Sequence, residues 1–410
     1  MYKTRNTASG DILSYYSNIN NVNYSIEQIK QEIDSTFVIK PHYRFHILNP
    51  DETVRMDIPE EDIISGGSYS ENYQSGQRRT VSFSLYNFNK KYTPSINGIW
   101  ANSKLSFEIG LEIDDLVIWF PKGIYIPTSI NATHQQGEMI VAIEASDKFS
   151  ILEDNNGMLT TSYTVPTGSN IHDVIQDLLK LSKGNGEILD PMPIVYNNAF
   201  KDKTTQAEIT KEVGDTVGSI ILELATQLNA EVFYDVDGHL NVVPINSVTD
   251  DVDKPIIYHF DNEIGGVSGN DLSFDLSSIV NRVIVIGSTN NGETYRAVAV
   301  NDNAGSPLCY QRIGYRTASP INDSNITSQV LAQERADYEL RQQLILKSSS
   351  SVEVRYNPLL LVNNLVTITD DFYGFNQEKF LIQDLSIPID YSGVMSITIS
   401  NIQNFTFLSR

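Results

Sequence analysis

The chain has 410 residues, of which 40% are hydrophobic and 20% charged, and its formal net charge at pH 7 is −22. A chain of this length accommodates two or three domains, each able to bury a core of its own. So large an excess of carboxylates argues against a protein that grips duplex DNA or docks on anionic lipid, because both kinds of binding depend on Lys and Arg side chains.

Residues 1–36 are rich in Asn, Ser and Tyr and are predicted to form an N-terminal arm. Ser25 is placed to cap a short helix that runs to Ile33, with Ile26, Ile29 and Ile33 on one side. Two interpretations stay open: an arm that docks on a neighbouring chain, and an arm that is disordered until assembly.

Residues 37–155 have the pattern of short antiparallel strands separated by Gly, Asn and Pro, which is typical of a sheet or a barrel. Two apolar runs on either side of Pro121-Lys122 are predicted to form a hairpin. Arg78-Arg79 precedes one strand and has two interpretations: a solvated edge, or a contact with an acidic neighbour. Alternating apolar positions place strands at residues 43–47, 81–85, 105–109 and 139–143.

Residues 156–250 change to helical periodicity and are predicted to form a small α/β domain. Ser169 or Asn170 caps a first helix, which Gly184 closes. Asp215 is predicted to cap a second helix that ends at Asn229. Strands at residues 231–235 and 240–243 follow, joined by the two-residue turn Asp237-Gly238.

Residues 251–410 return to β patterning and contain one long helix. Strands are predicted at residues 278–286 and 296–300, and the helix runs from Ile326 to about Leu346 after Asp323 or Ser324. Four further strands, at residues 351–356, 359–369, 380–387 and 394–402, are predicted to form a meander that closes a second barrel. The apolar side of the helix is assigned to Val330, Ala336, Leu340 and Leu344, and the solvated side to Glu334, Arg335, Asp337, Glu339 and Arg341.

Side chains with catalytic or metal-binding potential are scattered. His42 and His46 share one strand face, but no clear third ligand accompanies them, so we interpret them as ordinary histidines. Asp235-Val-Asp-Gly begins like a calcium loop but lacks the closing Glu, and we interpret it as turn chemistry. No phosphate-binding loop, nucleophile elbow or His-Glu-x-x-His pattern occurs. We therefore predict no enzyme activity, no cofactor, and no catalytic or metal-binding residue.

The single cysteine, Cys309, rules out an intrachain disulfide framework and indicates assembly in a reducing cytoplasm. We interpret its thiol as core filler rather than as a nucleophile. No apolar run reaches membrane-spanning length, so we expect no membrane binding by this chain alone.

Three passages together resemble one protein family. They are the helix and hairpin from Gly214 to Leu240, the run Arg78-Arg-Thr-Val-Ser-Phe-Ser-Leu-Tyr-Asn with Ile99-Trp100 and Phe120-Pro-Lys-Gly-Ile-Tyr, and the long helix with Tyr356-Asn-Pro-Leu-Leu and residues 362–369. They are similar to the baseplate hub proteins of contractile-tailed bacteriophages, a family that includes the tube-like part of type VI secretion spikes. Asn363-Asn364 departs from the Gly-Asp that many relatives carry there.

The resemblance implies an α+β, mainly β chain, in which a small α/β domain links two antiparallel β-barrel tube domains. The domains are then 1–36 (arm), 37–155 (first barrel), 156–250 (α/β) and 251–410 (second barrel with the long helix). It also implies a homotrimer in the virion tail baseplate, a symmetry adaptor between the six-fold tail tube or its initiator and the three-fold spike. Wedge proteins and a tape measure protein are further expected partners. DNA meets the chain only in transit through the channel during genome ejection, and we expect an acidic inner wall.

Two alternatives remain open at this point. One is another baseplate or distal-tail component, such as a wedge or a host-binding adaptor. The other is a tail protein associated with a cell-wall hydrolase, although all three predicted regions are already occupied by tube-type or insert-type structure.

Overall fold

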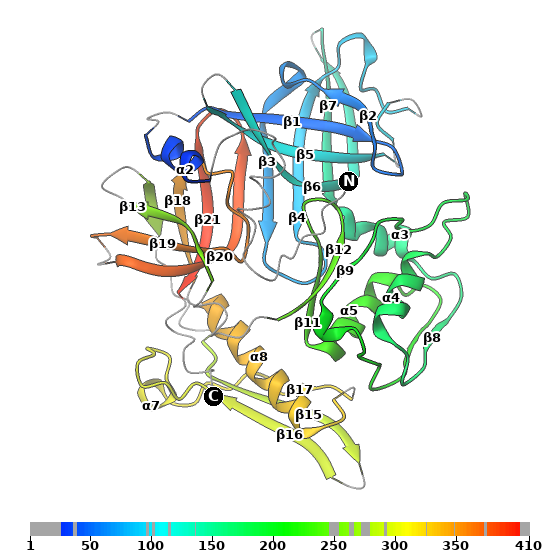
Figure 1. Cartoon of the computed structure of the whole chain (residues 1–410), viewed down its shortest axis with the longest axis vertical. Coiled ribbons are helices and arrows are strands. Elements are labelled where there is room, and N and C mark those ends of the chain that lie inside the picture. Colours follow the sequence, from blue (N-terminus) through cyan, green and yellow to red (C-terminus); the bar gives the residue numbers. More distant parts are fainter. Residues whose placement is uncertain are drawn as a thin grey trace.

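The computed structural model describes residues 26–35, 39–95, 98–100, 103–113, 116–135, 137–245, 254–261, 266–271, 279–290, 293–324, 326–347, 349–372 and 375–401. The chain is α+β and mainly β, as predicted (Figure 1). Among the described residues, no helix combines the length and the apolar character needed to cross a bilayer.

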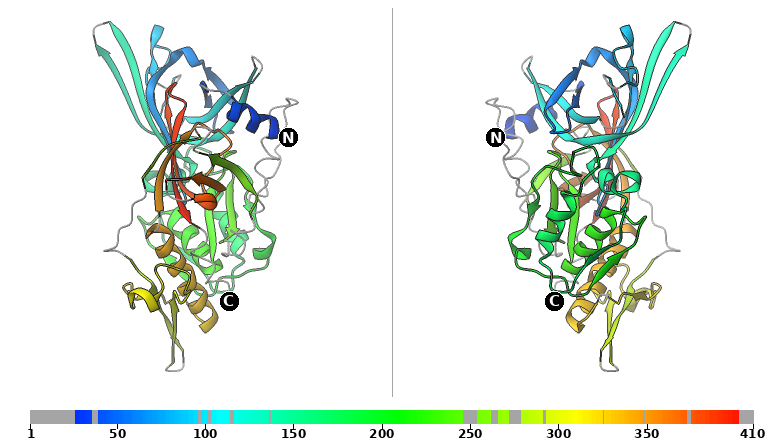
Figure 2. Two further views of the ribbon diagram at one scale, coloured as in Figure 1. Left: turned by 90° about the vertical axis from the view of Figure 1, so that its left-hand side faces the viewer. Right: turned by 90° about the vertical axis from the view of Figure 1, so that its right-hand side faces the viewer.

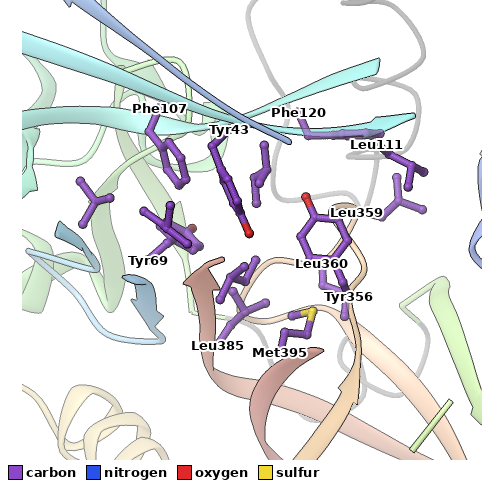
Figure 3. Packing of buried hydrophobic residues seen from close by; sticks show 14 of the residues in the cluster. Tyr43, Tyr69, Phe107, Leu111, Phe120, Tyr356, Leu359, Leu360, Leu385 and Met395 are labelled. Atoms are coloured by element: carbon purple, nitrogen blue, oxygen red, sulfur yellow. The ribbon is translucent and has the colours of Figure 1, made fainter. Parts of the chain in front are cut away.

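Both β regions of the chain contribute to one 13-stranded sheet. The join is made by β20 (Phe375–Ile389), which pairs with β21 (Val394–Asn401) and also, antiparallel, with β3 (Ile63–Asn72). The strand order is β14-β18-β21-β20-β3-β4-β7-β6-β5-β1-β2, with β19 beside β20 and β13 beside β19. A single hydrophobic core runs beneath both regions, and Figure 3 shows Tyr43 and Phe107 of the first facing Tyr356 and Met395 of the second.

The strands of the first region confirm the four predicted segments. Their alternating side chains put Phe45, Phe83 and Phe107 in the core, where the ring centroids of Phe45 and Phe83 are 3.8 Å apart. The bounds are β1 (Pro41–Leu48), β2 (Val54–Ile58), β3, β4 (Arg79–Tyr86), β5 (Lys104–Ile113), β6 (Leu116–Gln135) and β7 (Glu138–Asp147), with short 3-10 turns at Glu60–Asp62 and Phe88–Lys90.

The predicted hairpin around Pro121-Lys122 is wrong. Residues 116–135 form one continuous strand, β6, and the register with β5 shifts between Phe107 and Glu108, opposite Pro121. A bulge tolerates proline because it leaves a ladder position without a bond. Lys122 is fully buried, and its ammonium donates to the carbonyls of Pro358 (2.8 Å) and Leu360 (3.0 Å).

The helix predicted near the N-terminus is confirmed as α2 (Ile26–Ser35). Ile29 and Ile33 are buried in the shared core, and Arg355 of β18 donates to the Ile33 carbonyl (2.8 Å). The rest of the predicted arm lies outside the described residues.

The α/β unit follows β7 through the buried turn Lys148–Leu152. Asn170 caps α4 by accepting from the Asp173 amide (3.2 Å), but the helix ends at Leu179, before Gly184. The remaining elements are α3 (Asp154–Gly157), β8 (Tyr163–Val165), α4 (Ile171–Leu179), β9 (Val195–Tyr196), a 3-10 turn at Asn198–Phe200, β10 (Ile209–Lys211), α5 (Val217–Leu228), β11 (Ala230–Tyr234) and β12 (Leu240–Pro244).

Two predictions for α5 and its hairpin need correction. Thr216, not Asp215, caps α5 by accepting from the Ser219 amide (3.2 Å), because the Asp215 carboxylate turns back to the Glu212 amide (2.8 Å). The Asp237-Gly238 turn is longer than two residues, since the Asp235 amide donates to the carbonyl of residue 239 (3.0 Å) across a three-residue loop. Asn229 ends α5, as predicted, and the structure places it in the left-handed conformation (φ 51°).

The last four strands do not form a simple meander. β18 lies beside β21, so the order β18-β21-β20-β19 is that of a Greek key, because the segment between β18 and β19 crosses to the far side. β13 extends this sheet in parallel with β19. The bounds are β13 (Ile256–Asp261), β14 (Val267–Asp271), β18 (Ser349–Arg355), β19 (Leu365–Asp370), β20 and β21.

Between β14 and β18 lies a separate layer, in which the long helix α8 (Gln329–Lys347) packs on a small sheet. Helix α8 begins at Gln329 rather than Ile326, because Ser328 accepts from the Leu331 amide (3.2 Å). Its apolar side uses Ala332 in place of Val330, which is 66% exposed, and Arg341 is buried rather than solvated. The sheet comprises β15 (Arg282–Asn290), β16 (Glu293–Val300) and β17 (Ile321–Asn322), with α7 (Tyr310–Ile313) alongside.

Candidate functional site

A junction of buried charged side chains lies where the two β regions meet the α/β unit. It is organised by the Asp147 carboxylate at the end of β7, which accepts from the amides of Arg78 (2.7 Å), Arg79 (2.9 Å) and Phe149 (3.0 Å). Burial raises the pKa of Asp147. These bonds fix the backbone at the start of β4 and send the two arginine side chains into the interior.

The two arginines bridge different parts of the molecule. Arg78 donates to Glu231 of β11 (2.9 Å), and its guanidinium stacks 3.5 Å over the Phe233 ring. Arg79 donates to Glu71 of β3 (2.8 Å) and to the carbonyl of Tyr234 (2.7 Å). Contact with acidic neighbours is therefore the correct interpretation of Arg78-Arg79, and the solvated edge is wrong.

Glu71 extends the junction to the second β region. Its carboxylate accepts from the Tyr69 hydroxyl (3.1 Å) and from the Val362 amide (3.4 Å), and it is fully buried. Tyr43 makes a parallel link, because its hydroxyl donates to the carbonyls of Pro388 (2.9 Å) and Asp390 (2.7 Å). One set of groups thus ties the three parts of the chain together.

A second buried cluster centres on Lys148, just after β7. Its ammonium contacts the carboxylates of Asp190 (2.7 Å) and Glu52 (2.5 Å). Lys104 pairs with the same Glu52 (2.7 Å), and burial lowers the pKa of Lys104. The Tyr234 hydroxyl completes the cluster by donating to Asp190 (2.7 Å). This cluster holds the β1–β2 turn against the α/β unit.

Removing one partner of a buried pair leaves an uncompensated charge, which costs about 3–5 kcal/mol. The junction therefore makes the relative placement of the three parts specific. These charged groups hold parts of the structure in place, because the ammonium and guanidinium donors are bound by carboxylates and carbonyls of the same chain.

The Asp235 loop acts as a turn. One carboxylate oxygen of Asp235 accepts from the amides of Asp237 and His239 (3.0 Å each), and the other accepts from the Asn241 side chain (2.9 Å). Among the described residues, Asp235, Asp237 and His239 form the one group of three potential ligands close enough to share an ion. Hydrogen bonds within the turn account for this closeness, and the absence of metal-binding residues stays a prediction.

His42 and His46 lie on one face of β1, as their spacing predicts, and each contacts two carboxylates. His42 contacts Glu60 (3.0 Å) and Glu112 (3.2 Å) through opposite ring nitrogens. His46 does the same with Asp57 (2.7 Å) and Glu108 (3.4 Å). The hydrogen bond to Glu108 is the largest cause of the raised pKa of His46.

A groove of about 300 Å³ lies beside the Lys148 cluster, between the β1–β2 turn and residues 183–191. Its walls include Asp51, Ile126, Asn156 and Glu187. Lys104 also lines it, but that ammonium is held by Glu52 and by the Pro50 carbonyl (2.9 Å). Cys309 lies elsewhere and is fully buried, as expected for core filler.

No protein-family model and no curated protein matches the chain. Solved structures, in contrast, match most of the chain. The 43 kDa tail protein of prophage MuSo2 from Shewanella oneidensis superposes with a TM-score of 0.58 at 13% identity, over 89% of this chain and 99% of that one. A tail protein from Neisseria meningitidis gives 0.59 at 12% identity, over 89% and 98%.

The chain has the fold of phage tail proteins. The same fold occurs in the Francisella PdpA-VgrG complex, with a TM-score of 0.53 at 12% identity over 92% of this chain and 56% of that one. The resemblance to the hub family is thus confirmed at the level of fold. The sequence alone does not identify the junction. Glu231 is distant from the arginine pair in the chain, and Glu71, although only eight residues before Arg79, has the pattern of an ordinary surface carboxylate.

Proposed function

We propose that this chain is a structural component of a phage tail and forms the hub of its baseplate. In this role it is a homotrimer that joins the six-fold tail tube to the three-fold central spike. The observation that carries the proposal is the fold match over 89% of this chain and 98–99% of two tail proteins. Such a length match favours the same overall role rather than a shared module.

The two β regions are the proposed tube domains, at residues 37–155 and 251–410, with the α/β domain at 156–250 between them. Three copies then supply six tube domains, which matches a six-fold tube. The continuous sheet supports this arrangement, because β14 and β2 end its strand path and offer edges for neighbouring copies. The buried junction fits the same role, since a symmetry adaptor needs its two tube domains held at a set angle.

The net charge of −22 supports a channel that DNA passes without adhering. The proposed partners are the tail tube or its initiator, the spike, the surrounding wedge proteins and a tape measure protein. The proposed location is the baseplate of the virion tail, after assembly in the host cytoplasm, and the proposed role involves no catalysis.

Immunogold labelling of purified tails with an antibody to this chain tests the proposal. We expect label at the baseplate end of the tube. Label along the whole tube, or tails without the chain, contradicts a hub. Zymography on cell walls tests the hydrolase alternative, and clearing by the purified protein refutes the non-enzymatic role.

A further inference from the structure

The small sheet of β15, β16 and β17 has one covered face and one open face. Val283 and Val285 point toward α8 with Ala297 and Ala299, and all four are buried. Their neighbours alternate to the other side. Because Ile284 pairs with Val298 and Ile286 with Arg296, the second face carries Arg282, Ile284, Ile286, Arg296, Val298 and Val300.

Residues 315–317 contact the Arg282 end of this second face, and the rest of the face is at least partly exposed. Val298 is 41% exposed, Arg296 is exposed, and the other four side chains are partly exposed. Figures 1 and 2 show the sheet at the opposite end of the molecule from the β6–β7 ribbon, with α8 on one side only. Four branched aliphatic side chains on an open sheet face are typical of a protein–protein contact.

The charge of this part of the chain has the opposite sign to that of the rest. Residues 281–322 contain four arginines and two carboxylates, a formal charge of +2 in a chain of −22. Arg312 and Arg316 are exposed near the sheet, beside Tyr315. Arg282 lies 4.5 Å from the Tyr315 ring and donates to Thr317 (2.9 Å), and Tyr315 stacks on Tyr310 at 4.8 Å.

We propose that the open face of β15 and β16 docks on the acidic surface of a second copy of this chain. Charge complementarity identifies the occupant: the remainder of each copy carries a formal charge of −24, and a basic surface is attracted to a surface of that sign. The aliphatic centre of the face suits a protein surface better than a nucleic acid, whose phosphates contact Arg and Lys. A basic face on one copy against an acidic face on the next is a heterologous contact, and with a three-fold rotation between copies such a contact closes into the proposed trimer.

This inference rests on the proposed homotrimer and identifies the surface that it uses. The test compares two double variants with equal changes in charge. R296E/V298D alters the open face, whereas K201E/V213D alters exposed positions on the α/β unit. Sedimentation velocity over a concentration series, at low and at physiological salt, measures the association of each full-length protein.

We expect the wild type and K201E/V213D to associate alike, and R296E/V298D to associate at least ten-fold more weakly. The single variant Arg296→Lys keeps the positive charge and should associate as the wild type does. If R296E/V298D assembles as the wild type does, the proposal is refuted while the trimer stands. Binding of a single-stranded oligonucleotide by the wild type, lost in R296E/V298D, assigns the face to nucleic acid and also refutes it.

A second measurement covers the case in which R296E/V298D does not fold. A photo-crosslinker on Val298→Cys is selective, because the native Cys309 is fully buried. We expect a chain-to-chain crosslink whose mapped peptide is rich in Asp and Glu. Crosslinks confined to one chain contradict the proposal. Absence of the chain from tails, by contrast, overturns the proposed function and leaves this contact measurable.

Discussion

The link between Arg78 and Glu231 supports the sharpest prediction about stability. Arg78→Met removes the 2.9 Å hydrogen bond to Glu231 and the stacking on Phe233, and it leaves a carboxylate in a site that is nearly closed to water. Loss of one partner of a buried pair costs about 3–5 kcal/mol. We expect the lower end of that range, because the Tyr73 hydroxyl still donates to the Glu231 carboxylate after the substitution.

The compensating variant Arg78→Met/Glu231→Gln removes the stranded charge and keeps an acceptor for the Tyr73 hydroxyl. It should recover more than half of the loss, because replacing both ions of a buried pair is often nearly neutral. Urea unfolding measures the free energy, and hydrogen exchange in β11 shows whether the α/β unit loosens. Arg335→Met, which breaks a partly exposed pair with Glu339 on α8, is the control and should cost less than about 1 kcal/mol. A single variant as mild as this control, or a double variant worse than the single, refutes the reasoning.

Three further predictions concern other parts of the chain. The raised pKa of His46 means that its contribution to stability is fully present below the unfolded pKa and is lost as pH rises through the folded pKa. His46→Gln should therefore flatten the fall in unfolding free energy from pH 6 to 8, whereas His134→Gln, on the exposed β6–β7 ribbon, should not. Thr216→Ala should lower the free energy of unfolding by about 1 kcal/mol and speed hydrogen exchange in the first turn of α5. If Asp215→Ala speeds exchange there equally, the cap is misassigned. Lys122→Met leaves two buried carbonyls without their donor, which should lower the free energy of unfolding by about 1–3 kcal/mol for each carbonyl. A melting temperature equal to that of the wild type would contradict this stabilising role of Lys122.

Local signals in the sequence predicted the elements. Alternation placed β1, β4, β5 and β7, and the left-handed Asn229 ended α5 where expected. These predictions succeeded because periodicity and capping act over a few residues. The errors at Pro121-Lys122 and Asp215 have a local origin too, since a bulge and a turn use the same residue types as a hairpin and a cap.

The junction and the other buried cations could not be predicted in the same way. Lys122 and Lys148 are fully buried, although lysine is almost always a surface residue, and their partners come from distant parts of the chain. Two weak signals exist. Arg78-Arg79 directly precedes an alternating apolar strand, and Glu231 interrupts the apolar run of β11. Neither identifies its partner, because pairing over 153 residues depends on the fold.

The central claim is that three copies of this chain form the ring between tube and spike. A cryo-electron microscopy reconstruction of the tail's distal end tests it most directly. The account predicts three copies of this chain, arranged as a pseudo-six-fold ring that caps the tube. Six or more copies around the periphery, or a ring without this chain, would contradict it.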